Sequence, residues 1–99
     1  MSPQVDITKA ALADLRSIGD YTQKIWGPAQ RRDYLALLRE RFELLAQSPD
    51  MGLRHDMLSA GLLSASAGRH IFFYRKTVAG IRIIRVLHQS MDFRRHLTR

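Results

Sequence analysis

The stretch RHIFFYRKTVAGIRIIRVLH, residues 69–88, decides the fold. It contains two runs rich in aromatic and β-branched residues, 69–76 and 81–88, and this composition is typical of β-strands. The short segment 77–80 between them ends in Gly80 and predicts a hairpin loop. Both faces of each run are largely apolar, which predicts two central antiparallel strands covered on both sides.

Strict alternation assigns each side chain of these runs to one face. In the first run one face would hold Ile71, Phe73 and Arg75, and the other His70, Phe72 and Tyr74. In the second run one face would hold Ile81, Ile83, Arg85 and Leu87, and the other Arg82, Ile84, Val86 and His88. We expect helices over one side of the sheet. The C-terminal tail, a partner or both would cover part of the other side.

The first half of the chain has helical periodicity. A short alternating run at 5–7 predicts an opening strand, and Thr8 can cap the helix that follows. The predicted buried stripe of this helix is Leu12, Leu15, Ile18, Tyr21 and Ile25. Gly27-Pro28 ends it and starts a second helix, whose stripe is Tyr34, Leu35, Leu38, Phe42 and Leu45. The tight break predicts an antiparallel helical hairpin, with Trp26 packed where the helices meet.

The remaining segments complete an α+β pattern. Residues 48–52 end the second helix, 53–61 read as a loop, and 62–67 as a weak strand of mostly small residues. Residues 92–97 add a helical turn capped by Ser90 or Asp92. The order β-α-α-β-β-β predicts an N-terminal strand and a helical hairpin, followed by a three-stranded antiparallel meander and a short helical tail. With 99 residues, we expect one domain spanning 1–99.

Composition excludes several classes of protein. The absence of cysteine excludes disulfides, a thiolate zinc site and a cysteine nucleophile. No apolar run approaches the roughly 18 to 20 residues that a membrane span requires. The N-terminus lacks the basic start and apolar middle of a secretory signal. A cytoplasmic location is the expectation that fits these features.

The net charge of +7 lies in the second half of the chain. Residues 1–50 carry seven Lys/Arg and seven Asp/Glu, whereas residues 51–99 carry nine Lys/Arg, two Asp and all four histidines. The excess is mostly arginine, which suits planar, bidentate contact with carboxylate or phosphate. We therefore expect an acidic partner, either a protein or a nucleic acid.

The basic half of the chain suggests three kinds of chemistry. His88, Asp92 and His96 have helical metal-ligand spacing, but a chain turn before Asp92 removes that geometry, so no metal or other cofactor is expected. A metal-free ribonuclease would need a base, an acid and cations, which the sequence contains (His70 or His88, and several arginines) without placing them together. The mixture of basic and aromatic residues in 69–76 also fits a nucleic-acid-binding sheet, although its two adjacent phenylalanines point to opposite faces.

Short motifs follow one another in order along nearly the whole chain. They are Ala13-Asp14-Leu15, Asp20-Tyr21, Trp26-Gly27, Ser48-Pro49-Asp50-Met51-Gly52, Gly68-Arg69-His70 leading to Phe73-Tyr74-Arg75, and Arg85-Val86-Leu87-His88-Gln89-Ser90-Met91-Asp92. This ordered set resembles the ParE branch of the RelE/ParE toxin superfamily of bacterial type II toxin–antitoxin modules. One departure is Leu63, which stands where family members often have arginine, and the aromatic residue usual after it is missing; this would alter pairing specificity if the strand contacts the antitoxin or target.

The resemblance implies a non-catalytic toxin. Its partner would be an acidic ParD-like antitoxin, through which alone it would contact DNA, and its target would be DNA gyrase. The predicted antitoxin or target contacts are Arg69, His70, Tyr74, Arg75, Arg85, His88, Met91, Asp92, Arg94, Arg95 and His96. For His70 and Tyr74 a packing role is the alternative. The other functional hypotheses are a ribosome-dependent mRNA endonuclease of the RelE branch and a non-toxic relic that binds antitoxin.

Overall fold

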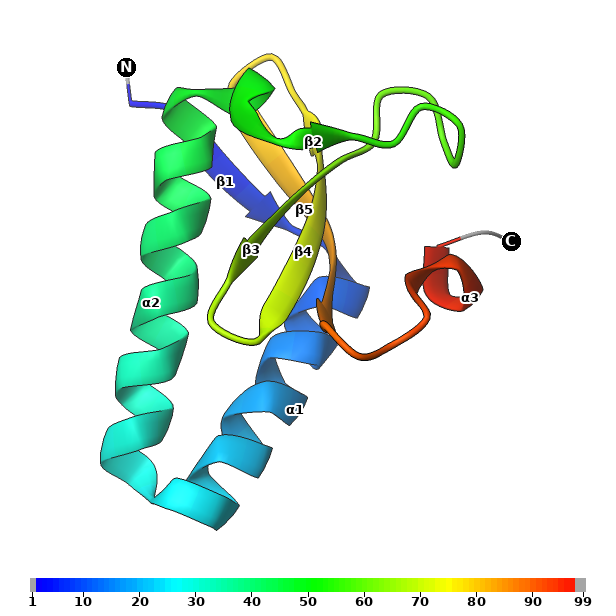
Figure 1. Cartoon of the computed structure of the whole chain (residues 1–99). Coiled ribbons are helices and arrows are strands. Elements are labelled where there is room, and N and C mark those ends of the chain that lie inside the picture. Colours follow the sequence, from blue (N-terminus) through cyan, green and yellow to red (C-terminus); the bar gives the residue numbers. More distant parts are fainter. Residues whose placement is uncertain (1, 98–99) are drawn as a thin grey trace.

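The computed structural model describes residues 2–97, which form a helical hairpin packed on a five-stranded sheet (Figure 1). The elements are β1 (Gln4–Ile7), α1 (Lys9–Trp26), α2 (Pro28–Gln47), the 3₁₀ turn η1 (Pro49–Met51), β2 (Leu53–Arg54), β3 (Leu63–Ala67), β4 (His70–Lys76), β5 (Gly80–His88) and α3 (Phe93–Leu97). The sheet order is β1-β5-β4-β3-β2, with β1 parallel to β5 and the other neighbours antiparallel. The predicted α+β fold is confirmed. The short strand β2 is an addition, because segment 53–61 was read entirely as a loop.

The helical hairpin begins and turns where the sequence predicts. The Thr8 hydroxyl accepts a hydrogen bond from the Ala11 N–H at 3.1 Å and caps α1. Gly27 ends α1 with a φ of 96°, a backbone conformation that glycine adopts without strain, and Pro28 opens α2. None of the helices within residues 2–97 combines the length and apolar character that crossing a lipid bilayer requires.

The sheet has a hydrophobic cluster on each face. On the helix side, Leu38 and Phe42 of α2 pack against Phe72 and Tyr74 of β4, and the Phe42 and Phe72 rings meet edge to face at 4.7 Å. On the far side a smaller buried cluster consists of Leu62, Phe73 and Leu87. Leu58, Phe93 and Leu97 pack against that cluster, so the loop and the tail cover the far face. The C-terminal tail, which was expected to cover part of the far side of the sheet, therefore does so.

A β-bulge in β5 changes the faces that alternation predicts. Phe73 pairs with Arg85 while Tyr74 pairs with Ile83, so Ile84 is an extra residue in the ladder. The helix-side cluster therefore contains Ile81, Ile83 and Val86, and the far-side cluster contains Ile84 and Leu87. The prediction that Val86 shares a face with Ile84 was wrong, because one inserted residue inverts every later side chain of the strand.

The Asp14 carboxylate of α1 holds this bulge. It accepts hydrogen bonds from Arg85 Nε at 2.7 Å, Arg85 Nη2 at 2.9 Å and the Val86 backbone N–H at 2.9 Å. The hydroxyl of Thr8 donates to the Ile84 carbonyl at 3.0 Å. The side chains of Asp14 and Arg85 are only 15% and 23% exposed, and hydrogen bonding to Asp14 raises the pKa of Arg85. These bonds fasten the start of α1 to the second half of β5.

The end of α1 projects beyond the sheet. Its 18 residues span ~27 Å, whereas β5 continues past Thr8 only through residues 84–88, roughly 17 Å. Tyr21, Ile25 and Trp26 are consequently 66%, 50% and 70% exposed. The prediction that Tyr21 and Ile25 belong to the buried stripe and that Trp26 packs between the helices was wrong, and Leu12 of the same stripe is also 41% exposed. We call Tyr21, Ile25 and Trp26 the hairpin overhang.

Removing the Asp14 carboxylate tests its structural role. Asp14→Ala leaves a half-buried guanidinium without its ion pair and the Val86 N–H without an acceptor, so we expect a loss of about 2 kcal/mol in the free energy of unfolding. Urea denaturation followed by circular dichroism measures this loss. The matched control is Asp50→Ala, which removes a fully exposed ion pair with Lys76 and should change stability little. Equal effects of the two substitutions would contradict the assignment.

Candidate partner-binding surface

The structure distributes the predicted contact residues over three places. The first group lies at the end of the sheet near the hairpin and comprises Arg69, His70 and His88. The second group is engaged inside the fold and comprises Tyr74, Arg75 and Arg85. The third group belongs to the C-terminal tail and comprises Met91, Asp92, Arg94, Arg95 and His96. The sequence did not reveal this division, because it depends on which arginines find acceptors in the folded chain.

A hydrogen-bonded cluster forms the sheet end. His70 and His88 are cross-strand neighbours whose rings meet edge to face with centroids 5.4 Å apart. The Tyr34 hydroxyl accepts the Arg69 N–H at 2.9 Å and shares a hydrogen bond of 2.6 Å with His70 Nδ1. Burial, with a smaller contribution from His88, lowers the pKa of His70. The β3–β4 turn is therefore attached to α2 through the Tyr34 hydroxyl.

The tail residues do not converge with the histidines of the sheet end. His88 Nδ1 accepts the Ser90 N–H at 3.1 Å, and Ser90 Oγ lies 2.8 Å from the same nitrogen. Asp92 instead caps α3, where its Oδ1 accepts the Arg94 N–H at 3.2 Å. Within residues 2–97 no group of three or more His, Asp or Glu side chains is placed to hold a metal ion.

Two predicted contact residues stabilise the fold itself. The Tyr74 side chain is 0% exposed, and its hydroxyl donates to the Pro49 carbonyl at 2.7 Å, so it presents no surface to a partner. Burial raises the pKa of this phenol. Arg75 donates to the Ala60 carbonyl and the Ser59 hydroxyl, each at 2.6 Å. Tyr74 therefore has the packing role that was its alternative, and Arg75 holds the loop between β2 and β3.

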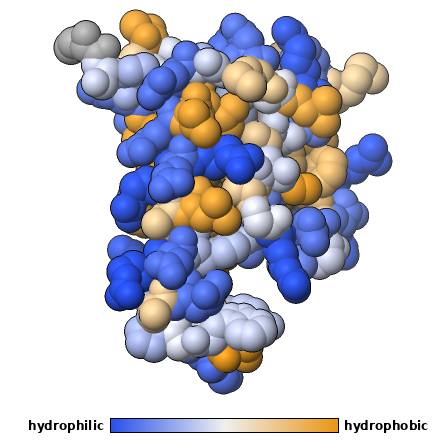
Figure 2. Space-filling model, turned by 60° about the vertical axis from the view of Figure 1, so that its left-hand side comes forward, coloured by the Kyte–Doolittle hydropathy of each residue, from blue (hydrophilic) through white to orange (hydrophobic). Residues whose placement is uncertain are grey.

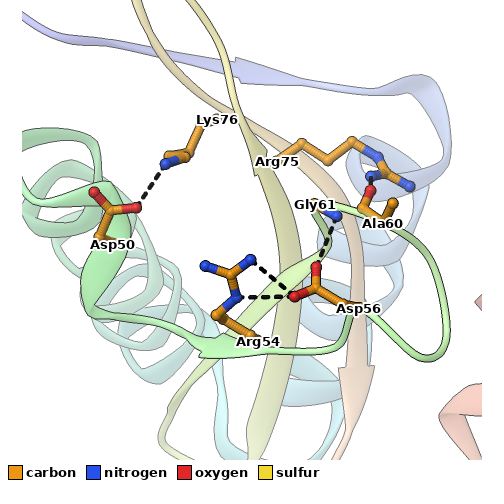
Figure 3. Close-up of polar contacts among 7 residues, drawn as sticks. All are labelled: Asp50, Arg54, Asp56, Ala60, Gly61, Arg75 and Lys76. Atoms are coloured by element: carbon orange, nitrogen blue, oxygen red, sulfur yellow. Dashed lines mark hydrogen bonds and ion pairs between the residues drawn. The ribbon is translucent and has the colours of Figure 1, made fainter.

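The same loop carries further charge-assisted contacts (Figure 3). Asp56 Oδ2 accepts Arg54 Nε at 2.9 Å, while its Oδ1 accepts the Gly61 N–H at 3.0 Å. The Gly61 bond and then the Arg54 bond lower the pKa of Asp56. On the neighbouring strand, Lys76 lies 2.6 Å from Asp50 and lowers the pKa of that carboxyl. These cations are compensated within the fold and leave the excess positive charge elsewhere.

The tail helix α3 stands between two surface clefts. The first cleft is lined by Arg54, His55, Asp56, Met57, Leu58, Phe93 and Arg94. The second is lined by Thr8, Ala10, Ile84, Arg85, Arg95, His96 and Leu97. Phe93 packs on Phe73 with ring centroids 5.2 Å apart, which anchors the tail on the far face of the sheet. The basic side chains of α3 consequently border both clefts.

Both the sheet end and the tail carry exposed cations without an ion pair. Arg69 and Arg95 are exposed, and within the described part of the chain neither forms a side-chain ion pair. Arg85, although it borders a cleft, is neutralised by Asp14. An acidic partner would therefore meet Arg69 and Arg95 rather than every arginine of the basic half.

Two residues that organise this surface were not predicted. Asp14 was noticed only as part of a motif, and Tyr34 was assigned to the core. A polar residue on the sheet-facing side of an amphipathic helix is the signal that could have identified Asp14, because a carboxylate in that position needs a buried donor. Nothing in the sequence pairs Tyr34 with His70, which lies 36 residues away.

Comparisons with known proteins point to one family of toxins. The family model described as the ParE toxin of the type II toxin–antitoxin system parDE matches residues 5–93. The chain is 42% identical over 91 residues to Toxin ParE1 of Caulobacter vibrioides, covering 92% of this chain and 94% of that protein. It is 40% identical over 98 residues to Toxin ParE1 of Mycobacterium tuberculosis, covering 98% and 100%. A solved structure titled "Chromosomal ParDE TA system from P. aeruginosa" superposes with a TM-score of 0.74 at 20% identity, covering 88% of this chain and 96% of that chain, and supports the fold.

The cluster at the sheet end predicts acid sensitivity. Because the folded-state pKa of His70 lies below the ordinary 6.5, the unfolded chain takes up a proton that the native state resists. The contribution of His70 to stability is thus complete above pH 6.5 and declines as the pH falls from there toward the folded-state value. Urea unfolding at about pH 7.5 and about pH 5.5 measures the decline, which should be smaller in His70→Gln. An identical pH dependence in the variant would refute this role of His70.

Proposed function

The chain belongs to the ParE toxin family of type II toxin–antitoxin systems, and from this premise we propose that it inhibits DNA gyrase in the bacterial cytoplasm and is neutralised by an acidic ParD-like antitoxin. The single observation that carries the proposal is the family match over residues 5–93. The relatives with 40–42% identity, which span nearly the whole chain, carry the name Toxin ParE1.

The surface charge supports an acidic antitoxin. Arg69 at the sheet end and Arg95 on α3 are exposed without intramolecular ion pairs, and His88 and His96 lie in the same two regions. Unpaired cations on a surface attract an acidic partner and accelerate its association. The similar structure titled as a ParDE system from P. aeruginosa also favours a partner of the ParD kind.

The environment of the arginines favours a toxin that binds its target over one that cleaves RNA. Cleavage of a phosphodiester requires cations free to stabilise charge on the phosphate oxygens. Arg85 is instead bonded to Asp14, and Arg75 is bonded to the loop carbonyl of Ala60 and the hydroxyl of Ser59. These bonds would have to break before either guanidinium could reach a phosphate. The mRNA endonuclease of the RelE branch is therefore the weaker hypothesis.

A supercoiling assay tests the target. Purified toxin should inhibit gyrase and trap cleaved DNA, and cells expressing it without antitoxin should form filaments while translation is initially intact. Addition of the antitoxin encoded beside the toxin should restore both gyrase activity and growth. Unaffected gyrase together with rapid mRNA cleavage in the ribosomal A site would overturn the proposal and favour the endonuclease. A folded chain that binds antitoxin but harms neither process would identify a non-toxic relic.

Charge reversal tests the contribution of the free cations to antitoxin association. Arg69→Glu/Arg95→Glu should lower the association rate with the antitoxin at least tenfold at low salt and weaken its salt dependence. Arg16→Glu/Arg39→Glu places the same double charge reversal on exposed residues of α1 and α2, in the half of the chain with no net charge, and serves as the matched control. Stopped-flow mixing measures the rates. Equal slowing by Arg16→Glu/Arg39→Glu would show a general effect of net charge instead of a localised contact.

A further inference from the structure

An apolar surface lies at the end of the molecule opposite the hairpin overhang (Figure 1). Leu44 near the end of α2, Met51 of η1 and Leu53 of β2 are 61%, 78% and 68% exposed. The Ser48 N–H donates to the Leu44 carbonyl and the Met51 N–H to the Ser48 carbonyl, so tight turns keep the three residues close together. Figure 2 shows hydrophobic surface in the upper part of the molecule, where this end of α2 lies. We call Leu44, Met51 and Leu53 the η1 patch; exposed apolar residues gathered in this way mark an interaction surface.

The η1 patch is held in place by the sheet behind it. The Tyr74 hydroxyl donates to the Pro49 carbonyl at 2.7 Å. Gly52 packs directly on the same hydroxyl, and a Cβ at this position would also lie only 2.8 Å from the Ser64 carbonyl. Leu53 pairs with Ser64 in the β2–β3 ladder. A surface that is ordered before binding loses less conformational entropy when a partner arrives.

The charges around the η1 patch balance one another. Lys76 lies 2.6 Å from Asp50, and Arg54 lies 2.8 Å from Asp56. The last two turns of α2, residues 41–47, carry one charge of each sign. This end of the molecule is therefore close to neutral, although the chain as a whole carries a net charge of +7.

Other exposed surfaces of the molecule are positive. Lys24 and Arg32 flank the hairpin overhang, Arg69 lies at the sheet end, and none of the three forms an ion pair within residues 2–97. Two copies of this basic protein would repel each other at those surfaces, and they can approach each other most closely through their neutral ends. An acidic partner, in contrast, gains no electrostatic advantage at a neutral apolar patch.

We infer that the η1 patch binds a second copy of this chain, so that two toxin molecules associate about a two-fold axis. Such an axis brings the same surface of both copies together, and the three apolar side chains of one copy would cover those of the other. The balanced charges suit this arrangement, because the cations of one copy can face the anions of its partner. Arg69, which precedes β4 at the end opposite Lys76, would remain outside the interface. The inference goes beyond the proposed function, since it involves neither the antitoxin nor the target.

Sedimentation equilibrium of the full-length toxin tests the association. The wild-type toxin should form dimers as its concentration rises through the micromolar range. Met51→Ser/Leu53→Ser should raise the dissociation constant of the dimer about 100-fold, because two apolar side chains of each copy lose their burial in the interface. The matched control is Tyr21→Ser/Ile25→Ser, which removes two exposed apolar side chains from the hairpin overhang and should dimerise as the wild type does. Unchanged melting temperatures verify that both variants fold.

Distances between spin labels locate the interface without altering the η1 patch. The chain has no cysteine, so one introduced cysteine carries a nitroxide label at a single position. Gln47 and Gln30 are exposed near opposite ends of α2, about 26 Å apart along the helix. Pulsed electron paramagnetic resonance on the dimer should therefore find a shorter distance between the two labels of Gln47→Cys than between those of Gln30→Cys.

Four results would overturn the inference. They are a wild-type toxin that stays monomeric up to about 200 µM, a dimer that survives Met51→Ser/Leu53→Ser, equal weakening of the dimer by the control variant, and a label distance that is shorter for Gln30→Cys than for Gln47→Cys. Because these measurements contain neither antitoxin nor gyrase, none of the four results would contradict the proposed function.

Discussion

The bonds from Asp14 to Arg85 and Val86 are the constraint on which the rest of the structure depends. Two residues after the bulged Ile84, the carboxylate of α1 accepts the Val86 backbone N–H. The same carboxylate neutralises the guanidinium beside it. Because the bulge decides which side chains of β5 face the helices, this interaction sets the composition of both hydrophobic clusters. It also fixes how far along β5 the helix begins, and therefore how far its other end extends past the sheet.

The structure divides the arginines of this basic protein into two kinds. Arg31, Arg75 and Arg85 are each bonded to specific acceptors and hold elements together. Arg69 and Arg95 have no such acceptor in the described part of the chain and determine the charge that an approaching partner meets. Net charge predicted an acidic partner, but it could not locate the contact. Location depends on hydrogen bonds that form only when distant segments fold together.

Local regularities explain which features were predictable from the sequence. Helical periodicity identified both long helices, and alternation together with residue composition identified four of the strands. Thr8, Gly27 and Pro28 marked helix ends for local stereochemical reasons. The faces of β5 were predictable only as far as the bulge, whose stabilising carboxylate is 71 residues away from Arg85. The exposure of Tyr21 could not be predicted from the sequence for a similar reason. An apolar stripe shows that a helix has a buried side, but the length of the sheet beneath it decides how much of that side is covered.

The pairing of β1 with β5 has a consequence for folding during synthesis. β1 is made first, yet its parallel partner is the last strand of the sheet, and Thr8 bonds to Ile84 across 76 positions. Contacts so distant in sequence form late and close slowly. The sheet cannot be completed on a nascent chain until residue 88 has left the ribosome. Any surface that depends on the completed sheet therefore forms only after β5 has been synthesised.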